Sequence, residues 1–144
     1  MTEIHSLDHA GLEVLTPEEC AEHLAATPVG RLGFIDRGEP VVLPITFGMW
    51  ERSVVFCTGS GSKLDAAIMG HPVVVEIDEW DAGTRQGWSV VVKGVAMTID
   101  DGREIDSLDR LQAASWVRPG SPKTWVRVLP DEITGRRIAP DTTD

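Results

Sequence analysis

A run of short strand-like segments is the feature that most constrains this fold. Residues 30–35, 40–47 and 53–58 are apolar and rich in β-branched side chains, as the strands of a sheet are. Only a few turn-forming residues separate each segment from the next, which leaves no room for a crossover helix. Strands joined by tight turns pair antiparallel, whereas parallel neighbours need a connection of about a dozen residues or more. A doubly wound parallel sheet is therefore disfavoured.

The rest of the chain adds further strands and three helices. The added strands are expected over residues 73–78, 87–99 and 124–129, the last one resuming over 132–138. The helices are expected over residues 17–26, 63–69 and 103–116. This order predicts a mainly β protein with a few α-helices, built as a small antiparallel barrel or sandwich. Gly94, inside the long fifth strand, predicts a bend or bulge such as a barrel needs at its corners.

The 144 residues suffice for one domain with a real core but not for two. Residues 1–14 are polar and weakly patterned, so we expect a loose N-terminal arm. The domain is expected over residues 15–139, and residues 140–144 are expected to form a frayed C-terminal tail.

Composition excludes several classes of function. The formal net charge of −10 disfavours binding to nucleic acid or to anionic membranes, because both reward lysine and arginine. No apolar run approaches the roughly 18 residues of a membrane span, and the first residues lack the pattern of a signal peptide. Cys20 and Cys57 are expected to be reduced, and the four scattered histidines match no metal template. These observations predict a cytoplasmic, metal-free protein.

The loop after the third strand has the composition of a phosphate site. Gly59 and Gly61 allow a close approach of a ligand to the backbone, and Ser62 is placed to cap a helix that begins at Lys63. Hydroxyls, free N–H groups and one lysine at a helix start suit an anion. The alternative is an ordinary strand–helix connection with a solvated lysine. The loop is not a P-loop, because Leu64 follows Lys63 where that motif requires Ser or Thr.

Two other features of the sequence, a proline within a strand and two tryptophans, bear on whether the chain binds a flat ligand. Pro44 lies inside the second strand, which places that strand at an edge or a bulge, because proline cannot donate to the ladder. Backbone groups left over at such an edge could serve a planar ligand, or could simply face solvent. Trp88 and Trp125 begin two later strands, where each is either a core residue or a wall for an aromatic ligand.

An obvious catalytic constellation is absent from the sequence. There is no Gly-x-Ser-x-Gly elbow, no Gly-x-Gly-x-x-Gly fingerprint and no tyrosine. Arg136 and Arg137 could pair with a phosphate or a carboxylate, but adjacent arginines are more often a solvated face. An anion site combined with apolar and aromatic surface suits a cofactor that carries its own chemistry.

Five segments, in this order, resemble the pyridoxamine 5′-phosphate oxidase-like flavin-binding family. They are Gly30-Arg31-Leu32-Gly33, the segment from Val42 to Phe47, the segment from Phe56 to Leu64, the segment from Gly87 to Gly94, and the closing segments 124–128 and 133–137. The resemblance covers about residues 15–139. It implies a six-stranded antiparallel split β-barrel of Greek-key type, a homodimer, and two flavin (FMN) sites at the subunit interface.

The resemblance also implies which residues contact the cofactor. Those expected to line the flavin ring, largely through their backbone, are Pro44, Ile45, Thr46 and Phe47. Those expected to hold the phosphate are Thr58, Ser62 and Lys63. Those expected to close the site are Trp88, Ser89 and Val90, together with Trp125 from one or the other subunit.

The chain departs from the vitamin-synthesising oxidases in two ways. Its phosphate loop carries the single lysine Lys63 where those enzymes have two cationic residues, and no histidine follows His71. The predicted function is therefore that of an FMN-binding oxidoreductase with an unknown small-molecule donor or acceptor. The alternatives are a deazaflavin-coenzyme-dependent reductase, with Arg31, Arg52 or Arg85 near its acidic tail, a non-catalytic flavin- or tetrapyrrole-binding protein, and a plain interaction module.

Overall fold

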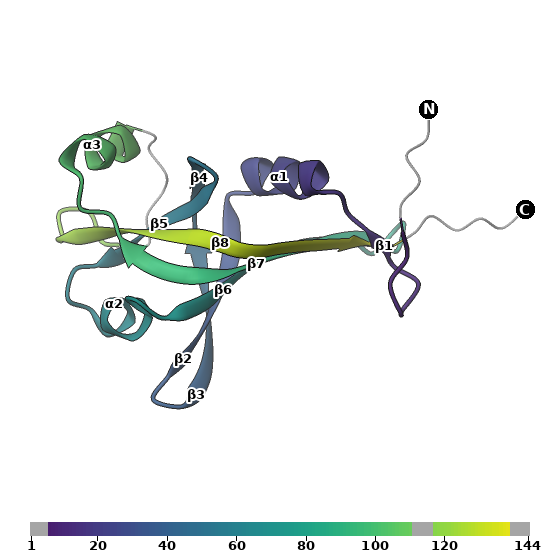
Figure 1. Ribbon diagram of the computed structural model, residues 1–144, viewed down its shortest axis with the longest axis horizontal. Coiled ribbons are helices and arrows are strands. Elements are labelled where there is room, and N and C mark those ends of the chain that lie inside the picture. The colour runs from purple at the N-terminus through teal and green to yellow at the C-terminus, as the bar shows by residue number, and fades with distance from the viewer. Residues whose placement is uncertain (1–5, 111–116, 139–144) are drawn as a thin grey trace, which may run out of the picture.

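The computed structural model describes residues 6–110 and 117–138. The strands are β1 (Glu13–Val14), β2 (Val29–Asp36), β3 (Glu39–Thr46), β4 (Gly48–Trp50), β5 (Ser53–Gly59), β6 (Pro72–Asp81), β7 (Gln86–Thr98) and β8 (Lys123–Arg137). The helices are α1 (Pro17–Ala26), α2 (Lys63–Ile68) and α3 (Gly102–Arg110). Figure 1 shows α3 at one end of the long β7–β8 ribbon and β1 at the other.

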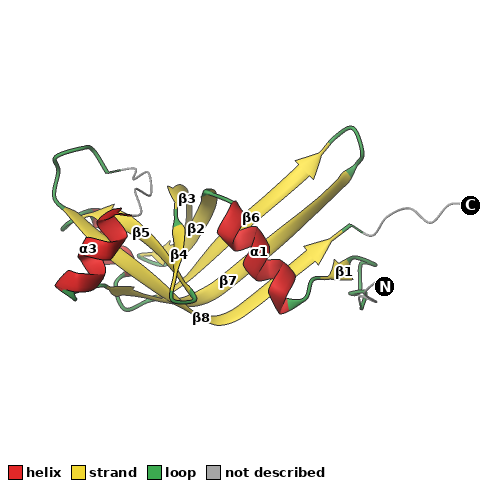
Figure 2. Ribbon diagram, turned by 90° about the horizontal axis from the view of Figure 1, so that it is seen from above, coloured by secondary structure: helices red, strands yellow, loops and turns green. Residues whose placement is uncertain are grey.

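The strands form one antiparallel sheet that curls into a half-barrel, as Figure 2 shows. Seven of them follow the order β3-β2-β6-β7-β8-β5-β4, and β1 pairs with β8. The predicted mainly β, antiparallel split-barrel class is confirmed, but the predicted count of six strands is too low. The missed strand β4 has three residues and begins one residue after β3 ends, so it has no pattern of its own in the sequence.

Proline explains the place of β3 in the sheet. β3 pairs along its whole length with β2, and it ends the strand order. Pro44, which lies opposite Arg31, therefore sits in an edge strand as predicted. Within the described residues, no further strand lies beyond β3, so its outer side is open to a ligand.

Gly94 marks the irregularity predicted in the fifth strand. The register of β7 against β8 shifts between Lys93 and Gly94. A Cβ atom at Gly94 would lie 2.2 Å from the carbonyl oxygen of Leu129, so only glycine fits where the two strands approach this closely. The bulge lets the ribbon bend around the core.

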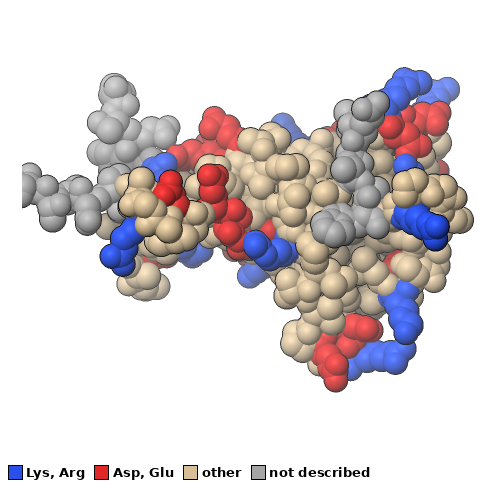
Figure 3. Space-filling model, turned by 180° about the vertical axis from the view of Figure 1, so that it is seen from behind, with Lys and Arg blue, Asp and Glu red and all other residues tan. Residues whose placement is uncertain are grey.

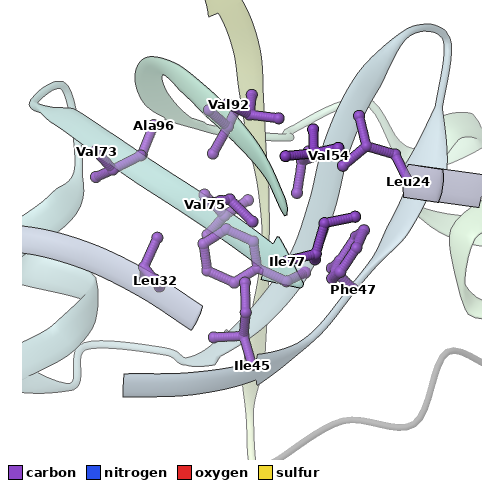
Figure 4. Close-up of a cluster of buried hydrophobic side chains, with 14 of the residues drawn as sticks. Leu24, Leu32, Ile45, Phe47, Val54, Val73, Val75, Ile77, Val92 and Ala96 are labelled. Carbon is purple, nitrogen blue, oxygen red and sulfur yellow. The ribbon is translucent and has the colours of Figure 1, made fainter. Parts of the chain in front are cut away.

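The core fills the inner side of the half-barrel. Alternate residues of the strands point inward, such as Leu32 and Phe34 of β2 and Val90 and Val92 of β7. Figure 4 shows side chains from different strands and from α1 directed toward one another in this cluster. A second, smaller cluster joins β5, β8 and α3. Its buried members are Val55, Ile99, Leu108 and Trp125.

The helices begin where their caps predict. Thr16 and Glu19 form a reciprocal capping box at α1, with N···O distances of 3.2 and 2.9 Å. Ser62 caps α2 by accepting the N–H of Asp65 at 3.1 Å. The described part of α3 ends at Arg110, and the rest of the predicted helix, from residue 111 to 116, lies outside the described residues.

Part of the expected arm packs against the sheet. Glu13 and Val14 pair with the end of β8, and Asp8 forms an ion pair of 2.6 Å with Arg136. The expectation of a loose segment therefore does not hold for residues 6–14. The sequence gives little sign of this, because β1 is only two residues long. The predicted tail, residues 140–144, lies outside the described residues.

Candidate functional site

The predicted phosphate loop connects β5 to α2. The side chain of Thr58 is buried, and its hydroxyl donates to Asp65 Oδ1 at 3.1 Å. The N–H of Gly61 donates to Asp65 Oδ2 at 3.2 Å, and the N–H of Ser62 donates to the carbonyl of Gly59 at 3.0 Å. The loop is thus tightly folded around one carboxylate.

Asp65 is the residue whose part in this loop the sequence did not predict. Its carboxylate already occupies two of the donors, Thr58 and Gly61, that an incoming phosphate would use. A phosphate must therefore displace this carboxylate or bind beside it. The only sequence signal was the position of Asp65, three residues after the helix cap Ser62.

Lys63 remains available to an anion. Its side chain is exposed, and it has no ion-pair partner among residues 6–110 and 117–138. The hydroxyl of Ser60, two residues before the cap, forms a 2.8 Å hydrogen bond with Thr124 of β8, which ties the loop to the sheet. The loop thus presents one free ammonium group on a fixed backbone.

The segment expected along the flavin ring divides into two kinds of residue. Ile45 and Phe47 are buried in the main core, so their side chains are not available to a ligand. Pro44 is exposed and Thr46 half-buried, and both belong to the edge strand β3. The N–H of Phe47 donates to the carbonyl of Pro28 at 3.1 Å. Any contact with a ring from Ile45 must therefore come from its backbone, as expected.

Trp88, Ser89 and Val90 lie at the start of β7. Trp88 and Ser89 are half-buried and line a shallow pocket of about 220 Å³, whereas Val90 is fully buried in the core. The ring of Trp88 stacks on His23 of α1, with centroids 3.6 Å apart and planes 20° from parallel. His23 was not singled out from the sequence, where nothing marks this contact between α1 and β7.

The two predicted arginines line the same pocket. Arg137 pairs with Glu13 at 2.6 Å and with Glu19 at 3.5 Å, and Arg136 pairs with Asp8. These contacts assign the arginines a role in fastening β1 and α1 to β8, and they leave less positive charge for a ligand.

Trp125 is enclosed under α3. Its side chain is 4% exposed, and its indole N–H donates to Asp109 Oδ1 at 2.8 Å. That hydrogen bond, followed by the contact with Lys123, lowers the pKa of the Asp109 carboxyl. In one chain, Trp125 therefore presents no open face, and its contact with a flavin stays a prediction.

Two groups of the predicted site residues lie at opposite ends of β8, apart from the segment of residues 44–47. At one end Thr58 pairs with Thr124, and at the other end Trp88 pairs with Arg137. At about 3.3 Å per residue, this stretch of strand spans up to roughly 40 Å. One chain therefore does not bring the phosphate loop and Trp88 together.

One cation near the edge strand is held in ion pairs. Arg31, opposite Pro44, contacts Asp78 at 2.7 Å and Glu76 at 3.2 Å. Burial, and then the neighbouring Asp78, raise the pKa of Glu76. This pairing weakens the case for Arg31 as a partner of an acidic coenzyme tail. Among the described residues, no group of His, Cys, Asp and Glu is arranged to hold a metal ion.

Comparison with known proteins shows the family of this chain. A model of the family described as pyridoxamine 5′-phosphate oxidase matches residues 16–137. The chain belongs to this family. An uncharacterised protein of Mycobacterium tuberculosis shares 30% identity with this family member over 133 residues, which are 89% of this chain and 86% of the relative.

Solved structures agree with this assignment. A Mycobacterium smegmatis structure described as an FAD binding protein is 36% identical, with a TM-score of 0.75, over 88% of this chain and 99% of the other. A Mesorhizobium loti structure described as an FAD-binding protein is 28% identical, with a TM-score of 0.70, over 89% and 99%.

The surface of this family member carries charges of both signs. Figure 3 shows acidic and basic side chains interspersed on one face, around a central area without charged groups. In the part of the chain that the structure describes, no helix is long and apolar enough to cross a membrane.

Proposed function

We propose that this protein is a flavin-binding oxidoreductase that holds the FMN moiety common to FMN and FAD. The observation that carries the proposal is the exposed ammonium group of Lys63, which has no ion-pair partner in the described part of the chain, beside the hydroxyls of the loop after β5. FAD-binding relatives of the same fold support the assignment of a flavin to this site. The residues fit such a group, because one cation and several hydroxyls suit the phosphate that FMN and FAD have in common.

Each predicted residue has a definite task in this proposal. Lys63 and the hydroxyl of Ser62 bind the phosphate. The phosphate replaces the Asp65 carboxylate as the acceptor for part of the hydrogen bonding in the loop. The open edge of β3, from Pro44 to Thr46, offers backbone groups to the polar rim of the flavin ring. Trp88 and Ser89 exclude water from the ring.

A homodimer completes this site. Because the phosphate loop and Trp88 lie at opposite ends of β8, two chains must meet for both groups to contact one flavin. A large exposed apolar surface supports such pairing, since Val42 is 65%, Ile35 60% and Leu129 60% exposed. Val42 and Ile35 also line an apolar hollow of about 420 Å³ on the sheet. We assign this face to the second copy.

The bound flavin would supply hydride transfer at its ring. The chain itself contributes binding, orientation and exclusion of water. We assign no residue as a general acid or base, and the two arginines near Trp88 are held in ion pairs that fasten β1 and α1. The protein would therefore depend on the cofactor for its chemistry.

The first test is the absorbance spectrum of the purified protein after incubation with FMN or FAD and removal of the excess. We expect retained flavin bands, and roughly tenfold weaker binding of both flavins in Lys63→Gln, because one charge-assisted hydrogen bond contributes about 1.5 kcal/mol or more. Arg103→Gln removes an exposed cation on α3 and serves as the matched control. A colourless parent that binds neither flavin would refute the proposal.

Turnover and cofactor choice need a second experiment. Steady oxidation of NAD(P)H with a quinone or nitro acceptor would distinguish an oxidoreductase from a passive flavin carrier. A parallel fluorescence titration with a deazaflavin coenzyme tests the alternative cofactor. Preference for that coenzyme by more than about tenfold, which corresponds to ~1.4 kcal/mol, would replace the flavin in the proposal.

A further inference from the structure

A pocket between the β2–β3 turn and α2 is assigned no task by the proposed flavin site. It has a volume of about 460 Å³, which lies in the range of small-molecule sites. Its lining residues come from the β2–β3 turn, from α2 and from the segment that leads from α2 into β6. Figure 1 shows the β2–β3 hairpin extending past α2. We propose that this pocket binds the adenylate half of FAD, an inference that rests on the proposed flavin site.

Three polar side chains at the pocket have no partner. Asp36, Arg37 and His71 line it, and none of them has a side-chain hydrogen bond or ion pair with the described residues 6–110 and 117–138. Arg37 lies in the two-residue turn Arg37-Gly38, with φ of 52° and 80°, which fixes its backbone at the rim. Groups of both signs that lie unpaired at one concave surface suit a ligand with several polar parts.

These groups match the polar parts of an adenylate. The Arg37 guanidinium suits a phosphate, with the exposed His71 as a further donor. The Asp36 carboxylate suits the ribose hydroxyls, as acidic residues do in dinucleotide sites. A phosphate alone would leave Asp36 as a repulsive neighbour, so the set of three favours a nucleotide over a simple anion.

The remaining wall of the pocket is apolar. It consists of Pro72 and of Ile35, at the border with the face assigned to the second copy, on the sheet side, and of Ala66 and Ala67 on the helix side. The alanine side chains are small enough for a flat ring system to lie against the helix. The pocket therefore offers a surface for adenine beside groups for ribose and phosphate.

The position of Lys63 connects this pocket with the proposed flavin phosphate. In a helix, residues three and four positions apart share a face, so Lys63 lies on the same side of α2 as Ala66 and Ala67. A pyrophosphate held at one end by Lys63 would extend along α2 toward Arg37. FMN would fill only the Lys63 end, whereas FAD would fill both.

The test compares FMN and FAD in fluorescence titrations of the parent and two variants. We expect the parent to prefer FAD, and Arg37→Gln to bind FAD about tenfold more weakly while its FMN affinity stays within about twofold. Ala66→Phe changes an exposed helix residue and should obstruct the pocket with the same selective effect. Arg103→Gln, the control cation on α3, should change neither affinity.

Competition with AMP provides a readout that is independent of any variant. AMP should displace FAD from the parent, because it is the adenylate half of FAD, and it should not displace FMN, because it lacks the second phosphate that Lys63 would bind. Equal affinities of FMN and FAD that Arg37→Gln leaves unchanged would overturn this inference while the flavin site stands. If neither flavin binds the parent, the proposed function fails as well.

Discussion

At the scale of single residues, Asp65 decides how the phosphate loop behaves. Ser62 and Lys63 could be predicted from the sequence, because caps and cations follow local rules. That the carboxylate of Asp65 accepts from Thr58 and Gly61 could not, since it depends on how a short loop folds back on itself. The chain thus keeps an anion of its own where a phosphate would bind.

We expect Asp65→Asn to bind flavin several-fold more tightly. The amide keeps an oxygen for the Thr58 hydroxyl but removes the charge that repels a phosphate. A flavin titration monitored by fluorescence measures the change, with Asp106→Asn on the exposed face of α3 as the control. Unchanged or weaker affinity in a variant with the parent's circular dichroism would show that the carboxylate does not compete with the ligand.

At the scale of elements, α3 is held to the sheet by two carboxylates with the same kind of partners. Glu104 accepts the indole N–H of Trp50 and contacts Arg127 of β8, and Asp109 accepts from Trp125 and contacts Lys123 at 3.1 Å. Each acid thus binds one indole and one cation. Together they fix α3 over the second apolar cluster.

We expect the stability contribution of Asp109 to depend on pH. The hydrogen bond from Trp125, and then Lys123, lower its pKa in the folded state. Such a group stabilises the protein above its unfolded pKa, near 3.8, and the contribution is lost as pH falls through the folded value. Asp109→Asn should therefore cost up to about 1 kcal/mol at pH 7, because the pair is partly exposed.

Urea unfolding between pH 7 and pH 3 measures this difference. The difference in unfolding free energy between the parent and Asp109→Asn should begin to narrow near the unfolded pKa of 3.8, below which the unfolded chain takes up the proton before the folded protein does. The exposed Asp106→Asn should show no such trend, because no ion pair joins Asp106 to the described residues. A difference in unfolding free energy that stays constant with pH would show that the effect comes from the shape of the side chain and not from its charge.

The secondary-structure elements are the part of the structure that the sequence predicted best. The capping box at Thr16 and the edge position of Pro44 both follow from local chemistry, and both are found where expected. The strands β1 and β4 were missed because two or three residues carry no periodicity. The enclosure of Trp125 by α3 depends on which side of the sheet the helix covers, and no local pattern determines that.

At the scale of the whole molecule, the exposed apolar face predicts self-association. We expect Val42→Glu to convert the proposed dimer to monomers, because the introduced charge would have to be desolvated on pairing. Sedimentation velocity measures the mass, and Leu7→Glu, at a position 61% exposed outside the strands, is the control. A Val42→Glu variant that keeps the parent's mass would place the interface elsewhere.

The length of β8 has a genetic consequence for such a dimer. Each chain would give its Lys63 end to one flavin and its Trp88 end to the other. Mixing a Lys63→Gln chain with a Trp88→Ala chain would then place both defects in one site and leave the second site intact. Two alleles that are each impaired alone would complement each other in the same cell, up to one intact site per mixed pair.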